Sequence, residues 1–317
     1  MRGLLLVAAL VLGACKGDAP PKVSAAAWAA VEAEARPAIA SGPPDELVRA
    51  YALLDGVTLP GDLQPRPEDA ARTVDALPEA AFDAVEALVR WDQGGGRLPP
   101  RSCRPSGTPL ATLKLARIAL LVAGDDGESP VVRAVVGLAA RHRGEGLSLL
   151  EGMIGSALAD AVRTWATERG LPAGEAARRY QPTEDGLRRI IAAEAVCSMT
   201  VIAEQPPAAA RAADGLVDGL DRALTDDALA RVLATEVPLV RRYWIDLLAD
   251  LRARPSDAAA IDRKIEARAD ALARDRVRHP VLGIVAPPTA HMLARLRASD
   301  DAYRAWLAGT APPPPAP

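Results

Sequence analysis

The sequence has few aromatic residues and no surplus of positive charge. Aromatic side chains make up 3% of its 317 residues, whereas β-sandwiches and barrels draw heavily on aromatic and β-branched residues. This composition therefore disfavours an all-β fold. Lys and Arg number 38 against 41 Asp and Glu, which gives a net charge of -3 at pH 7. Because duplex-DNA binding proteins need a basic surface, we expect no nucleic-acid partner.

The apolar runs of the sequence are short. Two of them stand out, residues 4–12 and 110–123, and both are shorter than the roughly 20 residues that a membrane-spanning helix requires. The second run is typical of a buried core helix. The first follows the basic residue Arg2 and precedes small residues, which is the order of parts in a secretory signal peptide.

A specific motif closes the first apolar run. Leu12-Gly13-Ala14-Cys15 resembles the lipobox of bacterial lipoproteins, in which a signal peptidase cuts before a diacylated cysteine. The resemblance implies that residues 1–14 are a signal peptide and that Cys15 carries the lipid at the start of a tether over residues 15–22. An ordinary signal peptide that happens to end near a cysteine is the alternative.

A lipid anchor predicts where the protein works. Several acyl chains hold a protein on a membrane far more firmly than a single chain does, so the membrane becomes a partner through the N-terminal lipid. Lys16 follows Cys15, and the Asp that marks inner-membrane retention in some bacteria is absent there. We therefore expect a lipid-anchored protein of the bacterial cell envelope, with the outer membrane facing the periplasm favoured over the inner membrane or the cell surface.

The two remaining cysteines, Cys103 and Cys197, are candidates for a disulfide. An even pair of cysteines in an oxidising envelope favours this pairing. Two independently buried thiols are the alternative, because free cysteine is among the most buried residue types. Neither cysteine has a second Cys or a His at ligand spacing, so the sequence predicts no metal site, and nothing in it indicates a cofactor.

From residue 23 onward the chain shows helical periodicity interrupted by Pro and Gly, with no convincing alternating strand. The sequence predicts an all-α fold, either a multi-helix bundle or an irregular α-solenoid of helix hairpins, with no substantial β-sheet. The irregular stretch between residues 98 and 109, rich in proline, predicts a boundary between an N-terminal helical region, 23–97, and a main helical domain, 108–310. Residues 311–317 form a Pro-rich tail.

Several helix boundaries follow from the local sequence. Ser129-Pro130 predicts an N-cap and the first helical residue behind it. Gly152 and Ser156 in the next helix, four residues apart, permit another helix to approach closely. Pro287-Pro288 predicts the start of a separate last helix. The apolar residues expected to face the core from the helix after Gly146 are Leu147, Leu150, Ile154, Leu158, Val162 and Trp165.

Three segments carry a second resemblance. They run from Leu113 to Leu121, from Leu147 to Ala161 and from His279 to Pro288. Together they are similar to a group of uncharacterised all-helical bacterial envelope proteins over about residues 110–305. The resemblance implies an all-helical fold, and it implies no catalytic residue.

Two charged residues fall on apolar helix faces. Glu194 follows Leu187 and Ile191 at helical spacing, and Arg268 lies between Ile265 and Leu272. Buried charges must be paired or shift their pKa. The favoured hypothesis gives each a partner across the bundle, with a pair between Glu194 and Arg268 as one option. The alternative makes Glu194 a general acid or base in a cleft.

These features favour a binding protein over an enzyme. The sequence holds no nucleophile elbow, no phosphate-binding loop and no paired metal-binding histidines. We therefore expect a lipid-anchored envelope protein that acts as a non-catalytic binding or scaffold module for another envelope protein. The alternatives are a cell-wall-directed hydrolase that uses Glu194 and a carrier of an apolar ligand between the helices.

Overall fold

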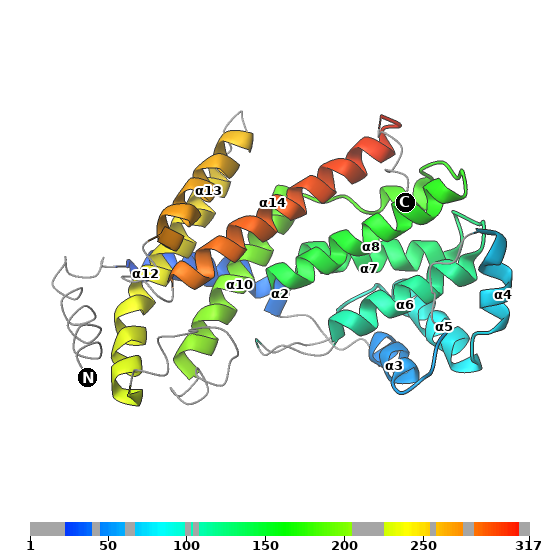
Figure 1. Ribbon diagram of the computed structural model, residues 1–317, viewed down its shortest axis with the longest axis horizontal. Coiled ribbons are helices and arrows are strands. Elements are labelled where there is room, and N and C mark those ends of the chain that lie inside the picture. Colours follow the sequence, from blue (N-terminus) through cyan, green and yellow to red (C-terminus); the bar gives the residue numbers. More distant parts are fainter. Residues whose placement is uncertain are drawn as a thin grey trace, which may run out of the picture. The chain divides into compact units, whose positions relative to one another are not determined.

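A computed structural model describes residues 23–39, 45–60, 67–98, 103, 108–204, 225–253, 258–274 and 282–310 (Figure 1). Within these ranges every regular element is a helix, which confirms the predicted all-α fold. The described residues divide into two compact units. Unit 1 takes the chain up to Glu34 and Glu194–Ala294, and unit 2 takes Ala35–Ala193 and the residues from Arg295 onward.

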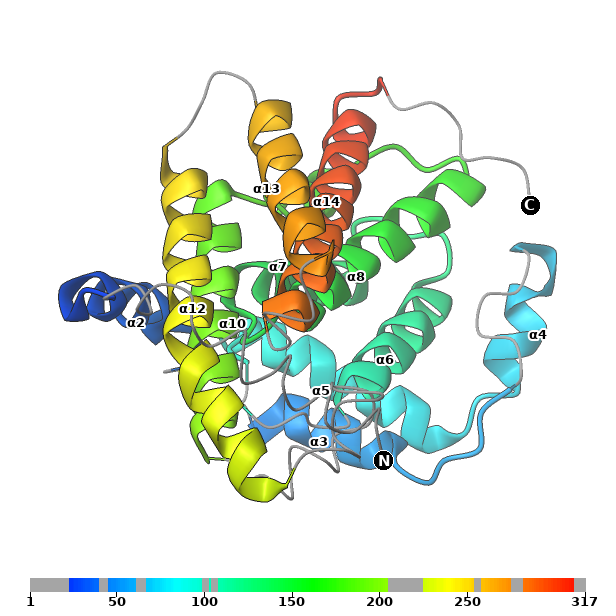
Figure 2. The same ribbon diagram turned by 60° about the vertical axis from the view of Figure 1, so that its left-hand side comes forward.

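Three helices contribute residues to both units, namely α2 (Ala25–Ile39), α10 (Glu184–Glu204) and α14 (Leu282–Leu307). The other helices of unit 2 are α3 (Asp45–Leu54), α4 (Ala70–Asp75), α5 (Glu79–Gln93), α6 (Thr108–Ala123), α7 (Pro130–Glu145), α8 (Leu149–Glu168) and α9 (Glu175–Arg178), with a 3-10 turn at Pro67–Asp69 before α4. Within unit 2, α7 packs most extensively against α8 and also contacts α5 and α6 (Figure 2).

The boundary expected near residues 98–109 does not separate the two units. Leu88 and Trp91, before this stretch, share one hydrophobic cluster with Leu115 and Leu138, which come after it. A short amphipathic helix must bury its apolar face against another element, and α5 does so against α6 and α7. The units divide instead within α2, α10 and α14.

Side-chain caps set the starts of α7 and α8. The N–H of Val132 donates to Ser129 Oγ at 3.2 Å, with Pro130 as the first helical residue, so the predicted N-cap is confirmed. At α8 the N–H of Glu151 donates to Ser148 Oγ at 3.2 Å, and the Glu151 carboxylate accepts from the N–H of Leu147 at 2.8 Å. Ser148 is therefore the N-cap of α8, and Glu151 reaches back to the N–H of the residue before it, in a variant of the capping box.

The predicted apolar face of α8 is wrong at one position. Leu150 is 54% exposed, whereas its neighbour Leu149 is fully buried. The predicted stripe advances by four residues from Leu150 through Leu158 to Val162, and each such step rotates the side chain by about 40° around a helix of 3.6 residues per turn. Three steps bring Leu150 about 120° away from Val162, and it therefore lies outside the core.

Unit 1 contains α12 (Asp226–Arg252) and α13 (Ala258–Arg274), in addition to its parts of α2, α10 and α14. Tyr243 of α12 is buried and its hydroxyl donates to the Ala286 carbonyl of α14 at 3.4 Å. Burial raises the pKa of Tyr243 to about 12. Glu236 of α12 accepts a hydrogen bond at 3.3 Å from the N–H of Leu282, the first residue of α14.

The predicted start of a separate helix at Pro287-Pro288 is wrong, because α14 runs through both prolines. Each proline removes one backbone donor from the helix interior. On either side of them, Leu282, Ala286 and Leu293 are buried. The burial of these side chains offsets the lost hydrogen bonds, since packing contributes more to the stability of a helix in a protein than local propensity does.

Some predictions fall on other parts of the chain. The lipobox with Cys15, the tether over residues 15–22 and the tail at 311–317 lie outside the described residues. Among the helices that the structure describes, none is both long enough and apolar enough to span a bilayer.

Candidate functional site

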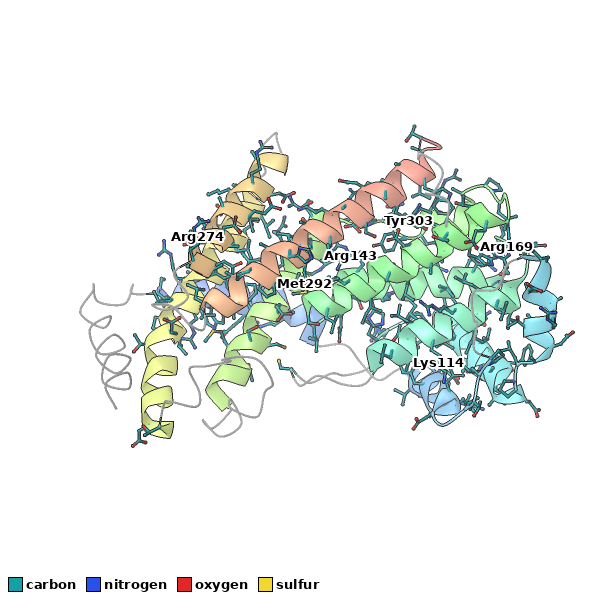
Figure 3. The ribbon with its side chains drawn as sticks, in the orientation of Figure 1. Lys114, Arg143, Arg169, Arg274, Met292 and Tyr303 are labelled. Atoms are coloured by element: carbon teal, nitrogen blue, oxygen red, sulfur yellow. The ribbon has the colours of Figure 1, made fainter. Side chains whose placement is uncertain are left out.

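A buried ion pair joins α7 to the C-terminal half of α14 within unit 2. Arg143 of α7 donates to Asp300 of α14, with Nε 3.1 Å and Nη2 2.5 Å from Oδ2. The two side chains are 3% and 2% exposed. Figure 3 places Arg143 beside α14. A buried charge pair of this kind needs further hydrogen bonds to compensate for its lost hydration.

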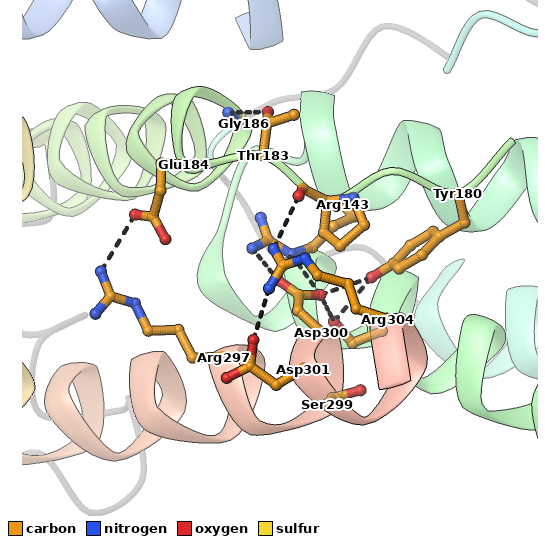
Figure 4. Close-up of polar contacts among 12 residues, drawn as sticks. Arg143, Tyr180, Thr183, Glu184, Gly186, Arg297, Ser299, Asp300, Asp301 and Arg304 are labelled. Atoms are coloured by element: carbon orange, nitrogen blue, oxygen red, sulfur yellow. Dashed lines mark hydrogen bonds and ion pairs between the residues drawn. The ribbon is translucent and has the colours of Figure 1, made fainter. Parts of the chain in front are cut away.

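Two hydroxyl groups supply these hydrogen bonds (Figure 4). Tyr180 donates to Asp300 Oδ1 at 2.9 Å, and Ser156 Oγ of α8 lies 3.5 Å from the same oxygen. Burial, together with the negative charge of Asp300, raises the pKa of Tyr180 far above its ordinary value. Tyr180 is therefore a neutral donor that holds the carboxylate of Asp300 in place.

A glycine lets α7 and α8 come close enough for this network. A Cβ atom at Gly155 would lie 2.6 Å from the backbone nitrogen of Arg143 and 2.7 Å from the Ala139 carbonyl oxygen. Any side chain at this position would push the two helices apart. The sequence singled out Gly152 and Ser156 for close approach, and the structure shows that Gly155 fills this role against α7, while Ser156 joins the polar network.

A cleft of about 480 Å³ lies next to this network in unit 2. The C-terminal ends of α5 and α7, the segment 179–183 and the first turns of α10 line it. The charged residues in its lining are Arg141, Arg143, Arg179, Arg189, Asp92 and Glu145. The residues that line the cleft therefore include four arginines and two acids.

Most of these charged side chains form an ion pair or a hydrogen bond with another residue of the protein. Arg179 donates from both terminal nitrogens to Asp92, at 2.8 and 2.9 Å, and these hydrogen bonds raise the pKa of the Arg179 guanidinium. Arg141 pairs with Glu145 four residues along α7 and donates to the Gly95 carbonyl at 3.0 Å. Arg189 donates from Nε to the Gly144 carbonyl at 3.3 Å.

The segment that leads into α10 is fastened to α14. Arg304 donates to the Pro182 carbonyl at 3.0 Å, and Arg297 pairs with Glu184 at 3.2 Å (Figure 4). At the start of α10 itself, Thr183 Oγ accepts from the N–H of Gly186 at 3.0 Å. These contacts fix the wall of the cleft that carries Arg189.

The structure places Glu194 outside the cleft lining. Glu194 lies in unit 1, where it is half-buried and accepts a hydrogen bond from Ser198 Oγ at 3.3 Å. The expectation that it faces the core is therefore met in part. The structure places it on the edge of the buried face of α10, with Ile191 and Ala195 buried beside it.

Arg268 is only half-buried, with 31% of its side chain exposed, and it finds its partner on another helix, as the favoured hypothesis expected. Its Nη2 lies 3.2 Å from Asp250 Oδ2 of α12, and Lys264 reaches Oδ1 of the same carboxylate at 2.6 Å. Asp250 was not singled out by the sequence. The pair option between Arg268 and Glu194 is thus replaced by a cluster around Asp250.

The cysteine prediction concerns chemistry outside the cleft. Cys103 and Cys197 are both disulfide-bonded. Their pairing with each other stays a prediction, and its test is described below.

Sequence reasoning missed the buried pair of Arg143 and Asp300, although a signal for it was present. Arg143 follows Ala139 by four residues, and Asp300 lies four residues after Leu296 and three before Tyr303. Ala139, Leu296 and Tyr303 are all buried. Helical spacing thus placed both charges on buried faces, by the same reasoning that identified Arg268.

Comparisons of this chain with family models, with curated proteins and with solved structures give no match. The resemblance of residues 110–305 to uncharacterised envelope proteins gains no support from them. The functional assignment of the cleft therefore depends on its own geometry.

Proposed function

We propose that this protein is a lipid-anchored, non-catalytic binding module of a bacterial cell envelope and that the cleft in unit 2 is its binding surface. The motif that ends at Cys15 supports the anchor. The cleft supports the binding role, because its volume of about 480 Å³ lies within the range of ligand sites. This arginine-lined cleft is the observation on which the proposal depends.

The cleft is organised for recognition. Asp92 and Glu145 each accept hydrogen bonds from an arginine, and the raised pKa of Tyr180 keeps its proton in place near neutral pH. General acid–base catalysis works best with a group whose pKa lies near the working pH, and the pKa of Tyr180 lies far above it. Tyr180 instead acts as a fixed donor. Donors fixed before the ligand arrives reduce the entropy that binding costs.

The two alternatives fit these observations less well. A carrier of an apolar ligand needs a mostly apolar pocket, whereas the cleft is lined by four arginines and two acids. A hydrolase that uses Glu194 needs this residue in a substrate site, and Glu194 is not among the residues that line the cleft.

The anchor is tested by membrane fractionation and mass spectrometry of the N-terminus. We expect the native chain in the membrane fraction with a diacylglycerol group on Cys15, and we expect Cys15→Ala to lose that group. Cys103→Ser serves as a control because it also removes one cysteine and leaves Cys15 in place. A native chain that carries no lipid on Cys15 contradicts the anchor.

The binding role is tested by crosslinking intact membranes and identifying the proteins that co-purify. We expect a stoichiometric envelope partner with the native chain, and loss of this partner with Arg141→Glu, which reverses a charge in the cleft. Arg133→Glu is the matched control, because Arg133 is an exposed residue of the same helix whose side chain lies outside the cleft lining. Equal loss with both variants would show that the cleft is not the binding surface.

A further inference from the structure

We propose that the cleft of unit 2 binds an oxyanion, a phosphate or carboxylate group, through Arg189 and the N-terminal turn of α10. This inference rests on the proposed function and deepens it, because it names the chemical class that the cleft recognises. The lining holds four arginines against two acidic residues. The positive charge of the cleft is therefore in excess before any ligand is considered.

The ion pairs show where this excess lies. Arg141 is neutralised by Glu145, and Arg179 is neutralised by Asp92. Arg143 is neutralised by Asp300, from outside the lining. Arg189 bonds a backbone carbonyl and has no carboxylate partner among the described residues. The uncompensated charge thus belongs to Arg189.

Arg189 offers its donors in the geometry that an oxyanion needs. Its Nε is engaged by the Gly144 carbonyl at 3.3 Å, which orients the guanidinium plane. Its two terminal nitrogens meet no acceptor among the described residues. A guanidinium presents parallel N–H groups that match two oxygens of a carboxylate or phosphate. The Arg189 guanidinium is therefore held in a fixed orientation, and its terminal N–H groups remain available for a ligand.

The start of α10 adds to the attraction. Thr183, Gly186 and Arg189 follow one another at intervals of three residues and all line the cleft. This face of the helix belongs to its first two turns, where the backbone dipoles give a partial positive charge. Anions bind readily at such helix starts. The N–H of Gly186 already donates to Thr183 Oγ, so the helix start contributes the partial charge of its dipole, and the direct hydrogen bonds come from Arg189.

An unpartnered donor in the wall of the same cleft is an independent observation. Arg143 lines the cleft and its side chain is 3% exposed. Nε and Nη2 bond Asp300, whereas Nη1 has no acceptor among the described residues. A buried charged donor without an acceptor is unfavourable. Nη1 is closed to solvent, so a bound oxyanion would remove this penalty only after a shift of the Arg143 side chain.

The test is a titration of the full protein, purified from whichever cell fraction contains it, with inorganic phosphate and separately with acetate. Binding is followed by NMR of arginine side chains and backbone amides, with sodium chloride at equal ionic strength as the reference. We expect saturable shifts at Gly186 and Arg189 with at least one of the two anions. No saturable shift with either anion overturns the proposal.

Two variants on α10 make the test specific. Arg189→Met removes the uncompensated charge, and we expect it to weaken anion binding by about tenfold or more. Arg188→Met removes the same charge from the adjacent residue, which pairs with Asp185 at 2.6 Å and lies outside the cleft lining. We expect it to change binding by less than about twofold, because its charge is balanced by Asp185 and its side chain is not part of the cleft lining. Equal weakening by both variants overturns the proposal.

A further arm identifies the source of the anion. Vesicles of phosphatidylglycerol are compared with neutral phosphatidylcholine vesicles, using the Cys15→Ala variant so that no lipid anchor contributes. Binding to the anionic vesicles that Arg189→Met abolishes assigns the oxyanion to a lipid headgroup, and binding of free anions alone assigns it to a soluble ligand. Because neither arm uses the anchor, failure of the anchor and failure of the anion site are separate results.

Discussion

Two neighbouring aspartates on α14 differ sharply in their surroundings. Asp300 is 2% exposed and pairs with Arg143, whereas Asp301 is 74% exposed and pairs with Arg304 at 2.6 Å. Removing one partner of a buried pair leaves an uncompensated charge and costs about 3–5 kcal/mol, while an exposed pair contributes at most about 1 kcal/mol. We expect Asp300→Ala to lower the free energy of unfolding in urea by about 3–5 kcal/mol, and Asp301→Ala by less than about 1 kcal/mol.

A double variant shows how much of the stability lost in Asp300→Ala comes from the unpaired charge of Arg143. In Arg143→Met combined with Asp300→Leu, apolar side chains of similar size replace both charges. Such replacements are often neutral or stabilising, so we expect the double variant to unfold at a higher urea concentration than Asp300→Ala. Equal destabilisation by Asp300→Ala and Asp301→Ala would contradict the picture of a buried pair.

The sequence indicates that a charge is buried, but it does not name the partner. Helical spacing predicted a buried Arg268, whose side chain is 31% exposed, and its partner Asp250 lies on a different helix. Asp300 lies 157 residues from Arg143 in the chain. Tertiary packing alone decides which buried charges meet over such separations.

At the scale of helices, the crossing of α7 and α8 depends on one glycine. A methyl group at Gly155 would lie within 3.0 Å of backbone atoms of α7, whereas at Gly152 the nearest atom would be Cδ1 of Ile190, the end of a flexible side chain, at 3.0 Å. Backbone cannot yield without moving the helix. We expect Gly155→Ala to lower the free energy of unfolding by about 2–4 kcal/mol, measured by urea denaturation.

Gly152→Ala is the matched control for this prediction. It introduces the same methyl group into the same helix and gains the same helix propensity, about 1 kcal/mol. We expect its effect on the free energy of unfolding to stay below about 1 kcal/mol. A Gly155→Ala variant as stable as Gly152→Ala would show that the helices can separate at little cost.

Local sequence signals predicted where a helix starts better than they predicted whether a helix continues through a proline. Ser129 and Pro130 determine the start of α7 through neighbouring residues, so the sequence was sufficient there. The passage of α14 through Pro287 and Pro288 depends on side chains buried by distant elements. A local rule cannot account for these contacts, and the predicted break was therefore wrong.

At the scale of the whole molecule, the all-α class was predictable and the cleft was not. Composition and periodicity are summed along the chain, and they identified the class without tertiary information. The cleft instead gathers Asp92, Arg141, Arg179 and Arg189 from separate elements. None of these residues has a motif around it, because each obtains its role from the packing of α5, α7 and α10.

The predicted disulfide also acts on the whole molecule, because it would connect two distant parts of the chain. Cys103 and Cys197 are both disulfide-bonded, and their pairing would close a loop of about 95 residues. In the chain-entropy model a loop of this length contributes about 4.7 kcal/mol, because the crosslink restricts the unfolded chain. We expect a peptide crosslinked between Cys103 and Cys197 in a non-reducing digest. We expect the double variant Cys103→Ser/Cys197→Ser to lower the free energy of unfolding by about 4.7 kcal/mol.

The same digest connects the disulfide to the proposed location. Disulfides persist in an oxidising compartment such as the bacterial periplasm and are rare in the cytosol. The crosslinked peptide should therefore be present in protein taken directly from cells whose thiols were blocked at lysis, and Cys15→Ala should leave it unchanged, because lipidation and crosslinking use different cysteines. Alkylation of Cys103 and Cys197 in that sample would contradict both the pairing and the oxidising location.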